Sequence, residues 1–177
     1  MTTRSRQEKI KRVMKNRLPE VRLIIEDVHD PHNAAAILRT CDALGVGSVL
    51  YLFDQEEPYN PKKVGKASSS SANKWVEIEV FKERAVLESR LKEEGFISLA
   101  STIHEPGAES LWESNLKEGK AALWVGNEHR GLSAEAMAFC DRKITIPMLG
   151  FVESLNVSVA AALFLAEIVR QRRCQGE

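Results

Sequence analysis

The sequence predicts an α/β fold in which a mostly parallel β-sheet carries helices on both faces. Two observations support this prediction. Short apolar segments alternate with helical segments, and the apolar segments are hydrophobic at consecutive positions, as in strands that are covered on both sides. The length of 177 residues suits one compact domain. We therefore expect residues 1–177 to form a single domain.

The chain opens with a basic helix, expected at about residues 4–18, whose apolar residues fall on one stripe. Residues 1–17 hold seven Lys or Arg and one acidic residue, Glu8, and a second basic end carries Arg170, Arg172 and Arg173. The whole chain is neutral, with 25 basic and 25 acidic side chains. Only the distribution of charge therefore points to a nucleic acid, and a solvated terminal helix is equally compatible with it.

The other elements follow in a regular order. Strands are expected at residues 21–28, 48–53, 76–81, 96–102, 121–125 and 143–146, and helices at 31–45, 82–95, 133–140 and 157–173. The first of these helices begins at Asp30 and Pro31, because aspartate caps free amide groups and proline fits the first helical position. The last helix has apolar residues on almost every side of its first three turns, so we expect it to be buried all round.

Composition and motifs disfavour several classes of protein. No apolar run approaches the roughly 20 residues of a membrane span, and no signal-peptide pattern opens the chain. The dispersed residues Cys41, Cys140 and Cys174 lack metal-ligand spacing and suit a reducing compartment. We expect a cytoplasmic protein without a metal or a membrane partner. The glycines within residues 45–48 precede a strand, which excludes a dinucleotide-binding loop, and no serine lies in a GxSxG elbow.

Three polar segments follow expected strands, and ligands of parallel α/β folds bind at the carboxyl ends of strands. They are EDVHDPHNAAAILRT (26–40), GNEHRGLS (126–133) and IPMLGFVESLNVS (146–158). In the third segment, N-capping of the last helix accounts for Ser154 or Asn156 alone, but not for the crowding of Pro, Gly, Glu, Ser and Asn. A fourth polar segment, residues 54–74, is long for a connection and is expected to be functional or mobile rather than idle.

Together, the three segments resemble the three motifs of the SPOUT methyltransferases, most closely the SpoU/TrmH-type tRNA guanosine 2′-O-methyltransferases. The likeness extends over almost the whole chain, including the basic N-terminal helix and the Lys74-Trp75 pair. The resemblance implies a C-terminal deep trefoil knot, a homodimer, S-adenosyl-L-methionine as cofactor and tRNA as partner. It implies an enzyme, a tRNA (guanosine-2′-O-)-methyltransferase, that methylates the ribose 2′-hydroxyl of guanosine 18 in the D-loop.

The resemblance also assigns roles by position. It implies catalytic roles for Asn33, Arg39, Glu128, Ser154 and Asn156, cofactor contacts for Thr102, Gly126, Ile146 and Leu155, and RNA contacts for Arg6, Lys9, Arg12, Lys66 and Lys74. Because arginine stays protonated at neutral pH, we expect Arg39 at least to clamp an RNA phosphate, with Ser154 or Asn156 orienting it or shaping the loop. Glu128 either orders its own loop by accepting backbone donors or interacts with RNA-contacting residues.

Alternatives to the D-loop guanosine remain. The minimal length resembles enzymes that methylate the tRNA wobble ribose, and rRNA ribose is a related target, whereas the basic helix and Lys74-Trp75 favour guanosine 18. A catalytically inactive knotted RNA-binding protein is disfavoured, because Arg39, Glu128, Ser154 and Asn156 are all present.

Overall fold

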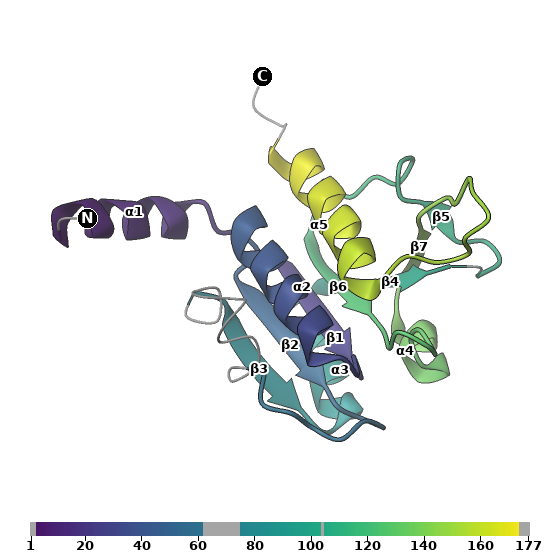
Figure 1. The fold of residues 1–177 in the computed structure, drawn as a ribbon. Helices are drawn as coiled ribbons and strands as arrows, with labels where there is room; N and C mark the ends of the chain where they lie inside the picture. The colour runs from purple at the N-terminus through teal and green to yellow at the C-terminus, as the bar shows by residue number, and fades with distance from the viewer. Residues whose placement is uncertain (1–2, 62–74, 104, 174–177) are drawn as a thin grey trace.

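The structure is a computed structural model that describes residues 3–61, 75–103 and 105–173. In chain order its elements are α1 (Thr3–Lys15), β1 (Val21–Glu26), α2 (Pro31–Leu44), β2 (Ser48–Leu52), β3 (Glu77–Phe81), α3 (Arg84–Glu93), β4 (Phe96–Thr102), β5 (Glu109–Ser110), β6 (Lys120–Val125), α4 (Ala134–Phe139), β7 (Arg142–Thr145) and α5 (Val157–Arg173). The strands form one sheet in the order β3-β2-β1-β6-β4-β7-β5 (Figure 1). Every neighbouring pair is parallel, which confirms the expected α/β sheet.

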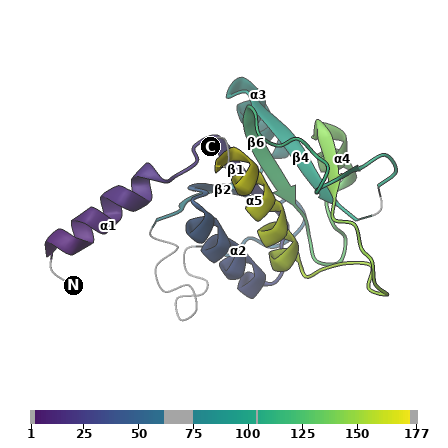
Figure 2. The ribbon, with the colours of Figure 1, turned by 90° about the horizontal axis from the view of Figure 1, so that it is seen from above.

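Helices cover both faces of the sheet, as expected. α2 and α5 lie side by side on one face, and α3 and α4 lie on the other (Figures 1 and 2). Two hydrophobic clusters correspond to these layers: one contains Phe164 of α5, and the other contains Leu87 of α3. Consecutive residues of β1 serve both clusters, since Leu23 belongs to the first and Ile24 to the second. This alternation explains why the strand is apolar at consecutive positions.

The central strands bring the three polar segments to one edge of the sheet. In β1, Leu23 pairs with Val49 of β2 on one side and with Leu123 of β6 on the other. β6 in turn pairs with β4, and β4 pairs with β7. Because all these strands run in the same direction, the segments that follow β1, β6 and β7 leave from the same edge.

The structure differs from the expected elements in three places. β1 ends at Glu26, two residues earlier than expected, because Asp27 has a φ of 51° and leaves the extended conformation. β5 was not expected, since two residues carry no periodic pattern. The expectation that α5 is buried all round is wrong for the single chain, where Val159 is 47% exposed. The sheet and α2 cover only part of this helix.

The ends of α2 form as the sequence predicts. The Asp30 side chain accepts a hydrogen bond from the backbone N–H of His32 at 2.8 Å, and Pro31 is the first helical residue. At the other end, Gly45 adopts a φ of 83°, the left-handed conformation that closes many helices. The polar segment 26–40 therefore includes a fixed helix start at the carboxyl edge of the sheet.

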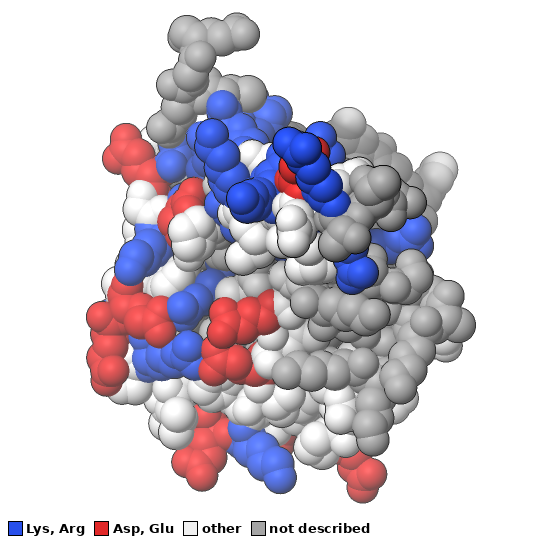
Figure 3. All heavy atoms as spheres, turned by 90° about the vertical axis from the view of Figure 1, so that its left-hand side faces the viewer, with Lys and Arg blue, Asp and Glu red and all other residues white. Residues whose placement is uncertain are grey.

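α1 projects away from the sheet and its covering helices (Figures 1 and 2). Its residues from Arg4 to Lys15 are half-buried or exposed, and Met14 of its apolar stripe is 58% exposed. Figure 3 shows this side of the molecule, with Lys and Arg side chains gathered in its upper part. Along the described residues, no helix is both long enough and apolar enough to cross a membrane.

Candidate active site

A pocket of about 670 Å³ opens at the carboxyl ends of β4, β6 and β7. Its volume lies within the range of roughly 300–1,000 Å³ that is usual for small-molecule sites. All four residues with implied cofactor contacts line it: Thr102, Gly126, Ile146 and Leu155. Three residues with implied catalytic roles, Glu128, Ser154 and Asn156, line it as well. The second and third polar segments thus share one cavity.

A tight turn after β6 forms one wall of this pocket. Asn127 and Gly131 exchange two backbone hydrogen bonds of 3.0 and 2.9 Å, and Gly131 has a φ of 69°. The turn packs so closely on itself that a Cβ atom at Gly126 would lie 2.2 Å from the carbonyl carbon of Gly131. Only glycine fits at position 126, and the turn presents Glu128 at the pocket wall.

A chain of side-chain hydrogen bonds joins the three polar segments. Glu128 Oε1 accepts from Asn33 Nδ2 at 2.8 Å, and Asn33 Oδ1 accepts from Asn156 Nδ2 at 3.0 Å. Asn156 Oδ1 accepts in turn from the backbone N–H of Ser158 at 2.9 Å. An ionised carboxylate only accepts hydrogen bonds, so the orientation of both amides follows from Glu128.

Glu128 also caps the start of α2. Its carboxylate accepts from the backbone N–H of His29 at 2.9 Å and of Asp30 at 3.1 Å. Burial raises the pKa of Glu128, but the hydrogen bonds from Asn33 and these amides outweigh it, so the pKa lies below its ordinary value. Of the two roles expected for Glu128, accepting backbone donors is the one observed. The donors belong to the segment before α2, however, and not to its own loop.

The two polar residues before α5 have different surroundings. Asn156 caps the helix, because its side chain holds the N–H of Ser158 and its carbonyl oxygen accepts from Val159 and Ala160. Ser154 is exposed and lines the pocket, and its hydroxyl makes no hydrogen bond within the described residues. Capping therefore accounts for Asn156 but not for Ser154.

Arg39 lies apart from the other residues with implied catalytic roles. It is an exposed residue of α2, six positions after Asn33, which is roughly 9 Å further along the helix axis. Neither Arg39 nor Asn33 is among the described residues that line the pocket. Asn33 still reaches the site through its hydrogen bonds with Glu128 and Asn156.

The residues with implied RNA contacts are only partly described. Arg6, Lys9 and Arg12 are exposed on α1, at a distance from the sheet (Figure 1). Lys66 and Lys74 lie outside the described residues.

The side chains of the second basic end make contacts within the chain, while Arg170 and Arg173 remain exposed. Arg170 pairs with Glu167 at 2.7 Å, Arg172 donates to the carbonyl of Gly119 at 2.8 Å, and Arg173 donates to the carbonyl of Asn16.

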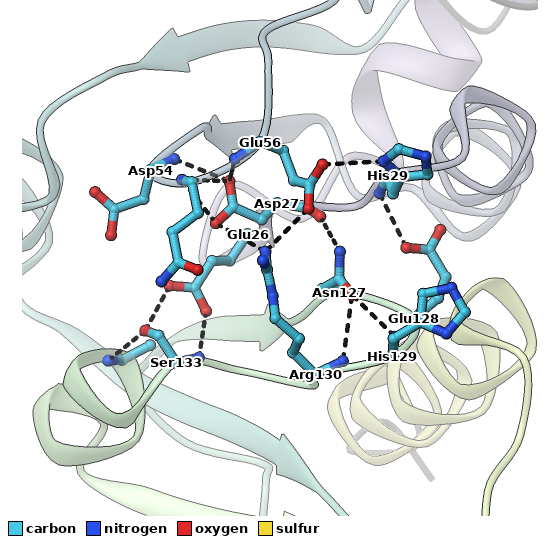
Figure 4. Close-up of polar contacts among 12 residues, drawn as sticks. Glu26, Asp27, His29, Asp54, Glu56, Asn127, Glu128, His129, Arg130 and Ser133 are labelled. Carbon is cyan, nitrogen blue, oxygen red and sulfur yellow. Dashed lines mark hydrogen bonds and ion pairs between the residues drawn. The ribbon is translucent and has the colours of Figure 1, made fainter.

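Two buried carboxylates that sequence reasoning missed hold the loops around the pocket (Figure 4). Glu26 accepts from the backbone N–H of Ser133 at 2.9 Å and from its hydroxyl at 2.7 Å, and it pairs with Arg84 at 2.5 Å. Asp27 accepts from the backbone N–H groups of residues 54, 55 and 56. The signal in the sequence was the pair of acidic residues at the end of an apolar strand, because carboxylates buried there need hydrogen-bond donors or cations as partners.

Asn127 connects this support to the turn that carries Glu128. Its side-chain amide donates to the carbonyl of Asp27 at 2.8 Å, and its side-chain oxygen accepts from the N–H of His129 at 2.9 Å (Figure 4). Asn127 is only 7% exposed, so these bonds are shielded from water. Among the described residues, no group of three or more His, Cys, Asp or Glu side chains is placed to hold a metal ion.

Comparison with known sequences places these motifs in a family. Residues 20–166 match the family model described as the SpoU rRNA Methylase family. The tRNA (guanosine(18)-2′-O)-methyltransferase of Thermus thermophilus is 40% identical over 170 residues, which cover 96% of this chain and 84% of the relative. The 23S rRNA (guanosine-2′-O-)-methyltransferase RlmB of Neisseria meningitidis serogroup B is 37% identical over 159 residues, which cover 90% and 62%.

Solved structures agree with the sequence comparison. The A. aeolicus TrmH/SpoU tRNA modifying enzyme superposes with a TM-score of 0.87 at 32% identity, over 98% of this chain and 85% of that chain. The SpoU methyltransferase AviRb of Streptomyces viridochromogenes, in complex with the cofactor AdoMet, superposes with a TM-score of 0.74 at 26% identity, over 92% and 60%. With two of its motifs at one pocket and the third joined to them by hydrogen bonds, this chain belongs to the SpoU rRNA methylase family.

Proposed function

We propose that this protein transfers a methyl group from S-adenosylmethionine to a ribose 2′-hydroxyl of tRNA, at guanosine 18. One observation carries the proposal: the second and third motif segments line one pocket, and the first is joined to them through the hydrogen bonds from Asn156 to Asn33 to Glu128. The 40% identical relative from Thermus thermophilus, named for this reaction, supports the choice of tRNA and of nucleotide.

The pocket fits the cofactor. Apolar side chains such as Leu132, Met137 and Ile146 suit the adenosine, and the carboxylates of Glu128 and Glu153 suit a positive charge. When bound, S-adenosylmethionine supplies an activated methyl group on a positively charged sulfur. The family relative solved with AdoMet supports this assignment.

The residues of the chain mainly have to align the acceptor oxygen with the methyl group, since the methyl group is already activated. In this proposal Arg39 binds a phosphate next to the target ribose, and the Ser154 hydroxyl on the pocket wall contacts the acceptor nucleotide. Glu128 is a weak base for the proton of the 2′-hydroxyl, because three N–H groups donate to its carboxylate and lower its pKa. Its role is to hold Asn33 and the start of α2.

A homodimer would complete this site. Leu149 and Phe151 beside the pocket are fully exposed, and Val159 on α5 is 47% exposed. Such apolar exposure in one region is typical of an interface. A second copy on the open side of α2 and α5 would cover these residues and bring its own Arg39 to the pocket. Sedimentation should therefore show a dimer, and Val159→Asp should yield monomers; a wild-type monomer at micromolar concentration would contradict the composite site.

Several further features belong to the same proposal. The chain from β7 to α5 passes through the deep trefoil knot that the SPOUT resemblance implies, and the TM-score of 0.87 with the A. aeolicus enzyme supports a shared topology. Residues 1–177 act as one methyltransferase domain in the cytoplasm, where tRNA is modified. The exposed side chains of Arg6, Lys9 and Arg12 on α1 bind the tRNA backbone.

The second candidate substrate is an rRNA ribose, which the 37% identical relative from Neisseria meningitidis favours. Incubation with labelled S-adenosylmethionine and either total tRNA or total rRNA separates the two. We expect the label in tRNA, with little transfer by Arg39→Ala. Label found only in rRNA would show that rRNA, and not tRNA, is the substrate. Label on a base would show that the enzyme methylates a base and not a ribose. If calorimetry detected RNA binding but no cofactor binding, the protein would be an inactive RNA-binding relative.

A further inference from the structure

Three loops form a closed ring of contacts beside the pocket (Figure 4). Glu128 accepts from the backbone N–H of His29 at 2.9 Å, and the Nδ1 atom of the His29 ring meets Glu56 Oε2 at 2.9 Å. The other oxygen of Glu56, Oε1, lies 3.2 Å from Arg130 Nη2. Two steps along the backbone lead from Arg130 back to Glu128. The ring therefore ties the loops after β1, β2 and β6 to one another.

Glu56 is the member that closes the ring, and it lies outside all three family motifs. Its side chain is 24% exposed and lies between two more exposed side chains, those of His29 and Arg130. The buried Asp27 holds the loop that carries Glu56, because it accepts hydrogen bonds from the backbone N–H groups of residues 54, 55 and 56. The carboxylate of Glu56 is thus held in place and does not swing freely into solvent.

Of the two ring residues at the pocket, Arg130 contacts this carboxylate directly, and Glu128 is connected to it through His29. Glu128 and Arg130 line the pocket. Without Glu56, the Arg130 guanidinium keeps only its contact with Asp27 at 3.6 Å among the described residues. The His29 ring then has no hydrogen bond within these residues. The turn with Glu128 and the start of α2 would then lose the link that joins them through the loop after β2.

We propose that Glu56 is a positioning residue for methyl transfer. It holds His29 and Arg130, and through them it fixes the Glu128 turn against α2 and shapes the cofactor wall of the pocket. The inference rests on the proposed function for its effect on catalysis, while its structural part stands on the contacts of the ring. Glu56 does not touch the reacting atoms itself.

The test compares Glu56→Gln with Glu57→Gln in the full chain. Both substitutions keep the side-chain size and remove one negative charge. Glu57 is the exposed neighbour, and its side chain makes no hydrogen bond or ion pair within the described residues. We expect Glu56→Gln to raise the Kd for S-adenosylmethionine and to lower kcat/KM for tRNA, each by about fivefold, as for other coupled neighbouring residues. Glu57→Gln should match the wild type.

Thermal unfolding separates positioning from general destabilisation. Because exposed ion pairs contribute little to stability, the melting temperatures of the two variants should agree within about 2 °C. Wild-type affinity and kcat/KM in Glu56→Gln would overturn the inference. So would equal losses in both variants, or a lower melting temperature with unchanged affinity.

Cofactor affinity, together with amide hydrogen exchange, distinguishes failure of this inference from failure of the proposed function. If the wild type binds S-adenosylmethionine but methylates no RNA, the function is wrong, and the difference in cofactor affinity between the two variants still decides the role of Glu56. If the wild type binds no cofactor, amide hydrogen exchange at His29 and Asp30 decides it. Faster exchange in Glu56→Gln alone supports the ring, and unchanged exchange rejects it.

Discussion

The side-chain amide of Asn156 donates a hydrogen bond to the side-chain oxygen of Asn33 at 3.0 Å, across 123 positions of the sequence. The side-chain amide of Asn33 donates in turn to Glu128 at 2.8 Å, so the two hydrogen bonds run in the same direction. Each donor in this chain points toward Glu128, whose carboxylate only accepts. Reversal of either amide would set two oxygens or two N–H groups against each other, so the relationship fixes the first and third motifs in one arrangement.

Asn33→Asp should impair the protein more than Asn33→Ala. It places a second carboxylate against Glu128 where a donor stood, and the loss of such a bond costs about 1–3 kcal/mol, or roughly 5- to 150-fold in a rate or affinity. Methyl-transfer rates and S-adenosylmethionine affinity are the measurements. The double variant Asn33→Asp with Glu128→Gln should recover part of the loss, because glutamine can donate to the new carboxylate. Equal activity of Asn33→Asp and the wild type would contradict the fixed orientation.

Gly126→Ala should destabilise the fold through the turn after β6. The added Cβ would lie 2.2 Å from backbone atoms of Gly131, so the turn must open. Overpacking of this kind costs about 1–3 kcal/mol in the free energy of unfolding, which urea titration measures. Gly150→Ala is the matched control, since its Cβ would meet open space, and it should change stability by less than about 0.5 kcal/mol. Similar values for both variants would show that the turn tolerates a side chain.

The stabilising effect of Glu128 should disappear in acid. Its folded-state pKa lies below the ordinary 4.5, so the group stabilises the fold above pH 4.5, and this contribution is lost as pH falls through the folded-state pKa. Urea unfolding of the wild type and Glu128→Gln between pH 6 and pH 3 measures the effect. The difference in unfolding free energy should be constant above about pH 5 and shrink below 4.5. A difference independent of pH would mean that the carboxylate is not the stabilising form.

Arg39→Ala and Asn156→Ala should complement each other when the chains are mixed. In the proposed dimer each site takes Arg39 from one copy and Asn156 from the other, so each heterodimer holds one intact site. Random mixing of two inactive variants then restores about a quarter of the wild-type activity. Mixing after partial unfolding and refolding, followed by a methyl-transfer assay, provides the measurement. Activity that stays at the level of the separate variants would place both residues in the same chain's site.

The sequence predicted local structure correctly where a pattern of a few residues determines it. The caps of α2 at Asp30 and Gly45 follow from residue type, and the apolar runs predicted every strand of the sheet except β5. The four expected cofactor positions all line one pocket. The caps and strands follow from rules that act over a few residues, and the pocket positions follow from motifs at strand ends; the cofactor contacts themselves stay a prediction.

Contacts between distant segments could not be predicted in the same way. The sequence left both backbone donors and RNA open as partners of Glu128, and only the fold brings it to His29 and Asn33, more than 90 positions away. Glu56 lies outside the three motif segments, and Asp27 lies inside the first without an expected role; the contacts of both follow from three loops meeting at one edge of the sheet. The open side of α5 escaped prediction as well, since an all-round apolar helix does not reveal whether its own chain or a second copy covers it.

The central claim is methylation of the ribose of guanosine 18, and one substrate tests it most directly. Two tRNA molecules are compared with labelled S-adenosylmethionine: one natural in sequence, and one with 2′-deoxyguanosine at position 18, which lacks only the acceptor oxygen. The first should accept one methyl group, and the second should accept none. Equal labelling of both molecules would contradict the proposed acceptor.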